Sequence, residues 1–294
     1  MDRHDDLAAE FEARRARLRA IAYRMLGSAG DAEDAVQEAW LRLSRAGSAD
    51  IGNLTAWLTT VVSRVCLDLL RARTAHREDP YGADLPERAA GGGPEEEAVL
   101  AESVGLALLV VLETLSPAER VAFVLHDVFG VPFERIAAIT DRSLPAAKKL
   151  ASRARHKVRG TPALPAAEQD RHRGVVEAFL AAARGGDLGA LLGLLAPDVV
   201  RHADPATLPP GVAAELRGAR AVAEGTVLLR DRARSAVPAL VDGRVGLVVA
   251  PRGRLRYVLR FTVEGDRVAA YEVVADPVRL RRLEVAVLDV PAAV

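Results

Sequence analysis

Apolar residues in the first eighty positions recur every three or four residues, which is the spacing of one face of an α-helix. This spacing predicts one helix around residues 18–25 and a second around 32–43. The third apolar stripe is the longest, and it consists of Leu54, Trp57, Leu58, Val61, Val62, Val65 and Leu69. Three such helices in succession predict an all-α first domain.

Residues 78–97 interrupt this periodicity with Pro80, Gly82, Pro86 and a Gly-Gly-Gly-Pro run. The composition predicts a flexible, acidic linker. A second helical group follows, in which Ser116, Pro117 and Glu119 form a capping box at the start of a helix expected over 117–128.

A short helix over 133–140, a turn at Asp141 and Arg142, and a longer basic helix from Ser143 to about Arg159 predict a helix-turn-helix. Pro145 is compatible with this longer helix because it falls in the first turn, where its missing N–H is not needed.

The pattern changes after a Pro-rich linker over 161–165. Helices are expected at about 170–184, 187–195 and 218–230, with a strand near 199–203. Apolar and polar residues alternate over 256–263, and a turn at 264–266 leads into a strand over 267–274. Helices followed by antiparallel strands predict an α+β domain.

The 294 residues include 40 Lys and Arg against 40 Asp and Glu, and one cysteine, Cys66. One cysteine excludes a disulfide framework or a Cys-based zinc site. The absence of a long uncharged apolar run, together with an acidic N-terminus, predicts a cytoplasmic protein with no membrane segment. A net charge of zero argues against nucleic acid only if the charges are evenly spread.

The charges are not evenly spread. Residues 31–38 carry four acids and no base, whereas 134–160 carry eight bases against Glu134 and Asp141. Basic residues also follow the third apolar stripe, at Arg64, Arg71, Arg73 and Arg77. The acidic helix is either solvated or faces a basic protein surface.

The basic helix from Ser143 fits a reader of the DNA major groove. A basic run alone more often marks a solvated helix face. The short helix and turn before it favour DNA instead. The candidate contacts are Ser143, Lys148, Lys149, Ser152, Arg153 and Arg155.

Several motifs in register resemble the bacterial extracytoplasmic-function sigma factors of RNA polymerase, over about residues 8–160. They are the stretch from Asp31 through Asp34, Gln37, Glu38 and Trp40 to Leu43, Ala56-Trp57-Leu58 with Asp68-Leu-Leu-Arg71, Leu115-Ser116-Pro117-Ala-Glu-Arg120, Phe133-Glu-Arg-Ile-Ala137, and Leu150-Ala-Ser152-Arg153-Ala-Arg155. The basic helix and the length of chain after it resemble the subgroup with a C-terminal SnoaL-like extension.

This resemblance implies a multidomain protein with two all-α domains followed by an α+β SnoaL-like cone. The expected parts are sigma region 2 (1–78), an acidic linker (79–102), the helix-turn-helix sigma region 4 (103–160), a second linker (161–167) and the SnoaL-like domain (168–294).

The resemblance also implies two partners, core RNA polymerase and promoter DNA. The polymerase contacts would be Asp31, Asp34, Gln37 and Glu38 on the clamp helices of the largest subunit, with the flap as a further contact. Arg64, Arg71, Arg73 and Arg77 would face the −10 element, and the loop 44–53 would hold a flipped base. The basic helix would read the −35 element, and the linker would thread toward the active-site and RNA-exit channels of the polymerase.

The chain departs from the subgroup in four places. Arg64 stands where many members of the wider family have Asn, and the linker keeps only Leu85-Pro86-Glu87 of a longer motif. Two motifs of the extension read Asp204-Pro-Ala-Thr-Leu208 and Asp276-Pro277-Val278-Arg279-Leu280 here. These differences predict regulation unlike that of typical members.

SnoaL-like domains enclose an apolar pocket, and Asp198, His202 and Asp204 are the candidate ligand-pocket residues. Three polar residues in a strand-and-loop region are ordinary surface chemistry, so we expect no catalytic site, cofactor or metal. The expected role is a regulatory module that packs on the helical domains. Two alternatives stay open: a helix-turn-helix repressor with an effector domain, and a SnoaL-type isomerase or cyclase with a vestigial DNA-binding half. The acidic helix argues against both, because a repressor has no use for it.

Overall fold

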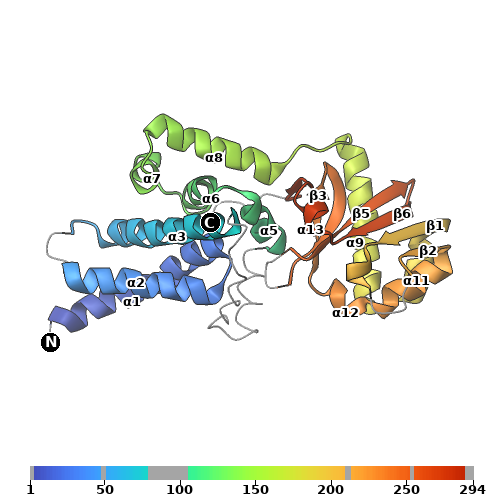
Figure 1. Ribbon diagram of the computed structural model, residues 1–294, viewed down its shortest axis with the longest axis horizontal. Helices are drawn as coiled ribbons and strands as arrows, with labels where there is room; N and C mark the ends of the chain where they lie inside the picture. The colour runs from blue at the N-terminus through green and yellow to red at the C-terminus, as the bar shows by residue number, and fades with distance from the viewer. Residues whose placement is uncertain (1–2, 48–50, 79–104, 209–212, 252–254, 289–294) are drawn as a thin grey trace. The chain divides into compact units, whose positions relative to one another are not determined.

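A computed structural model describes residues 3–47, 51–78, 105–208, 213–251 and 255–288 (Figure 1). The chain forms two compact units. The first draws its described residues from 3–105 and 112–155, and the second from 106–111 and 156–288. The predicted acidic linker and its Leu85-Pro86-Glu87 motif lie outside the described residues, as does the centre of the 44–53 loop.

The first unit begins with the three predicted helices, α1 (Arg3–Leu26), α2 (Ala29–Ala46) and α3 (Leu54–Glu78), which pack on one another. Polar side chains cap the N-termini of two of these helices. The Ser28 hydroxyl accepts a hydrogen bond from the Asp31 N–H at 3.3 Å, and the Asn53 amide oxygen accepts from the Ala56 N–H at 2.9 Å. The apolar stripes are the core, with Ile21, Leu43 and Leu58 fully buried. Each such side chain stabilises the fold by roughly 1.5–3 kcal/mol.

The second helical group consists of α5 (Leu106–Thr114), α6 (Pro117–Phe123), the π-helical turn η1 (Val124–Val128), α7 (Phe133–Thr140) and α8 (Leu144–Arg159). The capping box is confirmed, because the Glu119 carboxylate accepts hydrogen bonds from both the N–H and the hydroxyl of Ser116. The helix expected over 117–128 is α-helical only to Phe123. Asp141 takes a left-handed conformation (φ 54°) at the end of α7 and makes the predicted turn.

The α+β prediction for the second unit is confirmed. Helices α9 (Ala166–Gly185) and α10 (Leu188–Leu194) precede strand β1 (Leu195–Ala203), the 3-10 turn η2 (Pro205–Thr207) and strand β2 (Glu215–Arg217). Helices α11 (Ala219–Leu228) and α12 (Arg230–Ala233) follow, and then β3 (Ala236–Val241), β4 (Arg244–Val249), β5 (Tyr257–Glu264), β6 (Arg267–Val274), α13 (Pro277–Leu280) and β7 (Val285–Ala286).

These strands form one sheet in the order β2-β1-β6-β5-β4-β3-β7. All neighbours are antiparallel except β1 and β6, which run parallel. The sequence analysis expected only antiparallel strands. The parallel pair arises because β1 comes before the meander of β3 to β6 and joins its far edge.

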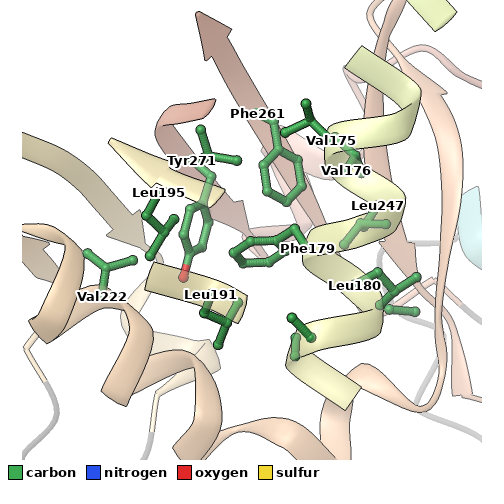
Figure 2. Close-up of a cluster of buried hydrophobic side chains, with 14 of the residues drawn as sticks. Val175, Val176, Phe179, Leu180, Leu191, Leu195, Val222, Leu247, Phe261 and Tyr271 are labelled. Atoms are coloured by element: carbon green, nitrogen blue, oxygen red, sulfur yellow. The ribbon is translucent and has the colours of Figure 1, made fainter. Parts of the chain in front are cut away.

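Helix α9 packs on the sheet, and three aromatic rings fill the contact (Figure 2). Phe179 of α9 meets Phe261 and Tyr271 edge-on, with ring centroids 5.2 and 5.4 Å apart. Phe261 and Tyr271 stack on each other across β5 and β6 at 5.5 Å. Such aromatic contacts add about 0.5–1.5 kcal/mol each beyond the area that they bury.

Backbone hydrogen bonds join the last turn of α8 and the segment after it to the β-sheet unit. The Val287 N–H donates to the Val158 carbonyl at 2.9 Å, and the Ala163 N–H donates to the Gly243 carbonyl at 2.8 Å. Gly243 has a φ of +76°, and a Cβ there would lie 2.7 Å from the Thr161 carbonyl oxygen, so only glycine fits. The predicted linker 161–167 therefore lies against the β3–β4 turn, and its last two residues already belong to α9.

Candidate nucleic-acid interface

Helix α8 has one apolar and one basic face. Ala147, Leu150, Ala151, Ala154 and Val158 are buried. The opposite face exposes three of the predicted contacts, Lys148, Lys149 and Ser152, and Ser143 is exposed just before the helix. Ser143 also begins the helix, since its hydroxyl accepts a hydrogen bond from the Ala146 N–H at 3.4 Å. The second helix of the predicted helix-turn-helix thus offers lysines at its N-terminal half, where such helices approach base edges.

The two predicted arginines of α8 are each paired with an acid of the same unit. Arg153 lies 3.4 Å from Glu119, the carboxylate of the capping box, and Arg155 lies 2.7 Å from Asp127. The side chain of Arg153 is 55% exposed while that of Glu119 is 7% exposed. These pairs fix α8 on α6 and η1, so Arg153 and Arg155 have a structural role that the charge pattern did not reveal.

The basic residues of α3 have different surroundings. Arg64 donates to the Ala138 carbonyl of α7 at 2.9 Å. Arg71 is exposed and lies 3.7 Å from Asp68. Arg73 donates to the Leu26 carbonyl at 3.0 Å and pairs with Asp31 at 2.5 Å. Arg77 belongs to α3, but its side chain is outside the described part of the chain.

The pair of Arg73 and Asp31 joins two residues that were predicted to face separate partners. It ties α3 to the start of α2. A second acid of α2, Glu33, pairs with Arg15 of α1. Asp34 and Gln37 are exposed, and the Glu38 carboxylate lies 2.8 Å from Arg42 one turn later. The exposed polar face of α2 is therefore carried by Asp34, Gln37 and Glu38.

In the second unit, Asp204 connects the two motifs of the extension. One carboxylate oxygen accepts hydrogen bonds from the Ala275 and Asp276 N–H groups at 2.8 and 2.9 Å, and the other lies 3.0 Å from Arg279. Arg279 also pairs with Glu272. Burial alone would raise the pKa of Asp204, but the two N–H groups and the guanidinium outweigh it and lower the pKa.

This arrangement gives a test. Asp204→Asn places an amide against two N–H donors and Arg279, so we expect a local loss of about 2 kcal/mol at pH 7. Because the folded pKa lies below the unfolded one, the stabilisation is present above about pH 4 and is lost as the pH falls through the folded pKa. Hydrogen–deuterium exchange over residues 270–288 should be about 30-fold faster in the variant at pH 7, and the difference should shrink at acidic pH.

The matched control is Asp198→Asn, which removes the same charge from an exposed position of β1, the strand that ends just before Asp204. It should leave exchange over 270–288 unchanged. Equal exchange in Asp204→Asn and the wild-type protein would contradict the role given to Asp204.

None of the three candidate pocket residues lines the cavity of the second unit. Asp198 and His202 are exposed on the outer side of β1, and His202 lies 3.3 Å from Glu215. The alternation of β1 instead turns Val199, Arg201 and Ala203 inward. Sequence reasoning missed Arg201, although its place between two apolar residues of the same parity was a signal for it.

None of the helices in the described part of the chain is long and apolar enough to cross a lipid bilayer. Within the same residues, no group of three or more His, Cys, Asp or Glu side chains could hold a metal ion.

Comparison with known proteins shows which families the helical parts of the chain match. Residues 11–76 match the family model of sigma-70 region 2, and residues 105–158 match that of sigma-70 region 4. The chain is 40% identical over 287 residues to the ECF RNA polymerase sigma factor SigJ of Mycobacterium tuberculosis, covering 92% of this chain and 91% of SigJ. It is 36% identical over 284 residues to the probable ECF RNA polymerase sigma factor SigI of the same organism, covering 94% and 96%. The crystal structure of M. tuberculosis SigJ matches with a TM-score of 0.45 at 36% identity, covering 93% of this chain and 98% of that one.

Proposed function

The chain belongs to the extracytoplasmic-function (ECF) family of RNA polymerase sigma factors, and from this membership we propose how its surfaces divide the work of starting transcription. It is an alternative sigma factor that recognises promoters through sigma regions 2 and 4. As such it binds core RNA polymerase and promoter DNA, and it acts where the DNA is, in the cytoplasm.

The −35 element is read by α8. Lys148 and Lys149 supply the charge, because both are exposed and neither has a carboxylate within 4 Å among the described residues. Ser152 lies on the same exposed face and Ser143 at the start of the helix, and both offer hydroxyl groups to bases or phosphates. Arg153 and Arg155 position the helix through Glu119 and Asp127 and extend its positive field.

The −10 element faces α3. Arg71 is exposed for this contact, with Arg77 one and a half turns further along. Arg64 is exposed as well, and it reaches DNA only if its hydrogen bond to Ala138 breaks. Arg73 supports this surface from within, through Asp31.

Core polymerase docks on α2. Asp34, Gln37 and Glu38 present two negative charges and one amide on one exposed helix face. A basic protein surface fits this face by charge complementarity, and we assign it to the clamp helices of the largest subunit, with region 4 on the flap.

The second unit modulates this activity, in our proposal as a SnoaL-like regulatory domain. It holds the last turn of α8, through Val158 and Val287, and the segment that follows α8, through Ala163 and Gly243. A change within the second unit can therefore alter the end of the helix that reads DNA.

The observation that carries the proposal is the exposed Lys148–Lys149 pair on the second helix of a helix-turn-helix within the sigma region 4 match. In vitro transcription tests it. Full-length protein with core polymerase should give a specific transcript from the upstream region of its own gene, and neither component alone should do so. Tight operator binding without polymerase, and no transcript with it, would instead identify a repressor.

The same assay tests modulation. Protein that ends at Gly160 should give less transcript, because the Val158 carbonyl loses the Val287 N–H and the last turn of α8 loses its support. Circular dichroism must show that its helices remain. An unchanged yield would contradict a modulating role.

A further inference from the structure

The second unit contains a cavity of about 630 Å³, counted with its mouth. It lies between α9, α11 and α12 and the inner faces of five strands of the sheet. Its walls are largely apolar and include Phe179, Leu180, Leu247, Val249, Leu259 and Val273. Four of the lining residues, Phe179, Leu180, Leu247 and Tyr271, are labelled in Figure 2.

The charges that line this cavity all have one sign. Arg201 and Arg232 are among its lining residues, and no Asp or Glu is among those that the structure describes. Arg232 is exposed, donates to the Thr207 carbonyl, and places its charge near Tyr257. The cavity therefore has a positive potential without a carboxylate of its own to balance it.

Arg201 is the centre of this potential. It is 2% exposed and is the largest of the fully buried side chains in the described residues. One terminal nitrogen donates to the Ala213 carbonyl, but its buried Nε has no hydrogen-bond partner among the described residues. A buried guanidinium that lacks both a carboxylate and a full set of acceptors is costly, and this cost falls when an anion binds beside it.

Other polar groups lie at the same end. The Tyr271 hydroxyl and the Thr226 hydroxyl are 2.9 Å apart, and the Arg201 charge acts on the Tyr271 phenol. Gly225 also lines the cavity, and a Cβ there would come within 3.6 Å of an Arg201 nitrogen and 2.7 Å of the Leu216 side chain. The absence of a side chain at Gly225 thus lets α11 approach Arg201 and Leu216 closely.

We propose that this cavity binds a small apolar carboxylic acid, with the carboxylate on Arg201 and Tyr271 and the hydrocarbon body against the apolar walls. This is the ligand class of the unit to which we assign a regulatory role. The effect of binding on transcription rests on the proposed function, whereas binding itself does not. A guanidinium matches a carboxylate in planar geometry. Because the Thr226 hydroxyl donates to the Val222 carbonyl at 2.8 Å, the Tyr271 hydroxyl is the one that can turn from Thr226 and donate to the carboxylate.

Full-length protein and titration calorimetry test this site. The probes are decanoate and 2-naphthoate, each compared with the alcohol of the same skeleton, 1-decanol and 2-naphthalenemethanol. At least one acid should bind at least tenfold more tightly than its alcohol. Equal binding of acid and alcohol, or no binding of either acid, would overturn the proposal.

Two variants locate the site. Arg201→Met keeps the length of the side chain and removes the charge, so the preference for acid over alcohol should disappear, whereas Arg217→Met at an exposed position of β2 should keep it. Ala233→Phe places a bulky side chain at another lining position of the cavity and should abolish binding of both compounds. It serves as the decisive variant if circular dichroism shows that Arg201→Met does not fold, and persistence of acid binding in it would refute the site. Because the readout is binding, a negative result leaves the transcription test unaffected.

Discussion

Replacing Lys148 and Lys149 together with alanine should lower transcription from the cognate promoter about 30-fold at moderate salt. Each lysine is exposed on α8, and Lys148 has only a distant contact with the Phe133 ring, 6.0 Å from its centroid. Both charges are therefore available to phosphates or base edges. Loss of two such contacts costs about 2 kcal/mol of promoter binding, and it should reduce the slope of log affinity against log salt by about two.

The matched control removes two positive charges from the second unit, with Arg220→Ala and Arg234→Ala. Their side chains are 82% and 81% exposed, and each pairs with an acid of its own helical segment. Holoenzyme made with this control should transcribe like the wild type and show the same salt slope. If both double variants lose activity equally, the lysines act through net charge and not through contact with the promoter.

The helices and the antiparallel strands could be predicted from sequence because their signals are local. The apolar stripe of α3, the capping box at Ser116 and the turn around Gly265 each depend on residues a few positions apart. The Asp242-Gly243 pair between β3 and β4 is an equally local sequence signal, because Asp-Gly favours a hairpin turn in which both residues have positive φ, as they do here. Its function as the attachment point of Ala163 was not predictable, because that contact joins segments eighty residues apart.

The partners of charged residues could not be read from the sequence. The charge runs indicated that α8 is basic and α2 acidic, but a run does not show which of its charges are paired within the fold. The fold divides them: Arg153 is paired with Glu119, whereas Lys149 has no ion pair in the described residues. Likewise, Asp31 and Arg73 neutralise each other over a separation of 42 positions.

The pocket prediction shows a related limit. It chose Asp198, His202 and Asp204 for their chemistry, but a strand turns alternate residues to opposite faces, so the side of the sheet that holds the cavity decides which residue can act. Arg201 lies on that side and His202 does not. The sequence feature that indicates Arg201 as a cavity residue is its position between Val199 and Ala203, two apolar residues on the same side of the strand.

Neutralising Asp34 and Glu38, with Asp34→Asn and Glu38→Gln, should weaken binding to core polymerase about 30-fold and leave the fold intact. Asp34 is exposed and has no ion pair among the described residues, and Glu38 contacts only Arg42, one turn away. Loss of two interfacial charges costs about 2 kcal/mol where a basic surface faces them. Equilibrium binding of labelled protein to core polymerase measures the effect.

The matched control carries Glu224→Gln and Asp231→Asn. These substitutions remove two exposed acids of the second unit, each of which pairs with an arginine three or four positions away. This control should bind core polymerase like the wild type. Asp31→Asn should behave differently from both, because Asp31 holds Arg73 and its loss loosens the junction of α2 and α3. Its binding defect should be accompanied by lower thermal stability, whereas the Asp34 and Glu38 double variant should melt like the wild type. Full polymerase affinity in that double variant would show that α2 is only a solvated acidic face, and the docking surface would then have to lie elsewhere on sigma region 2.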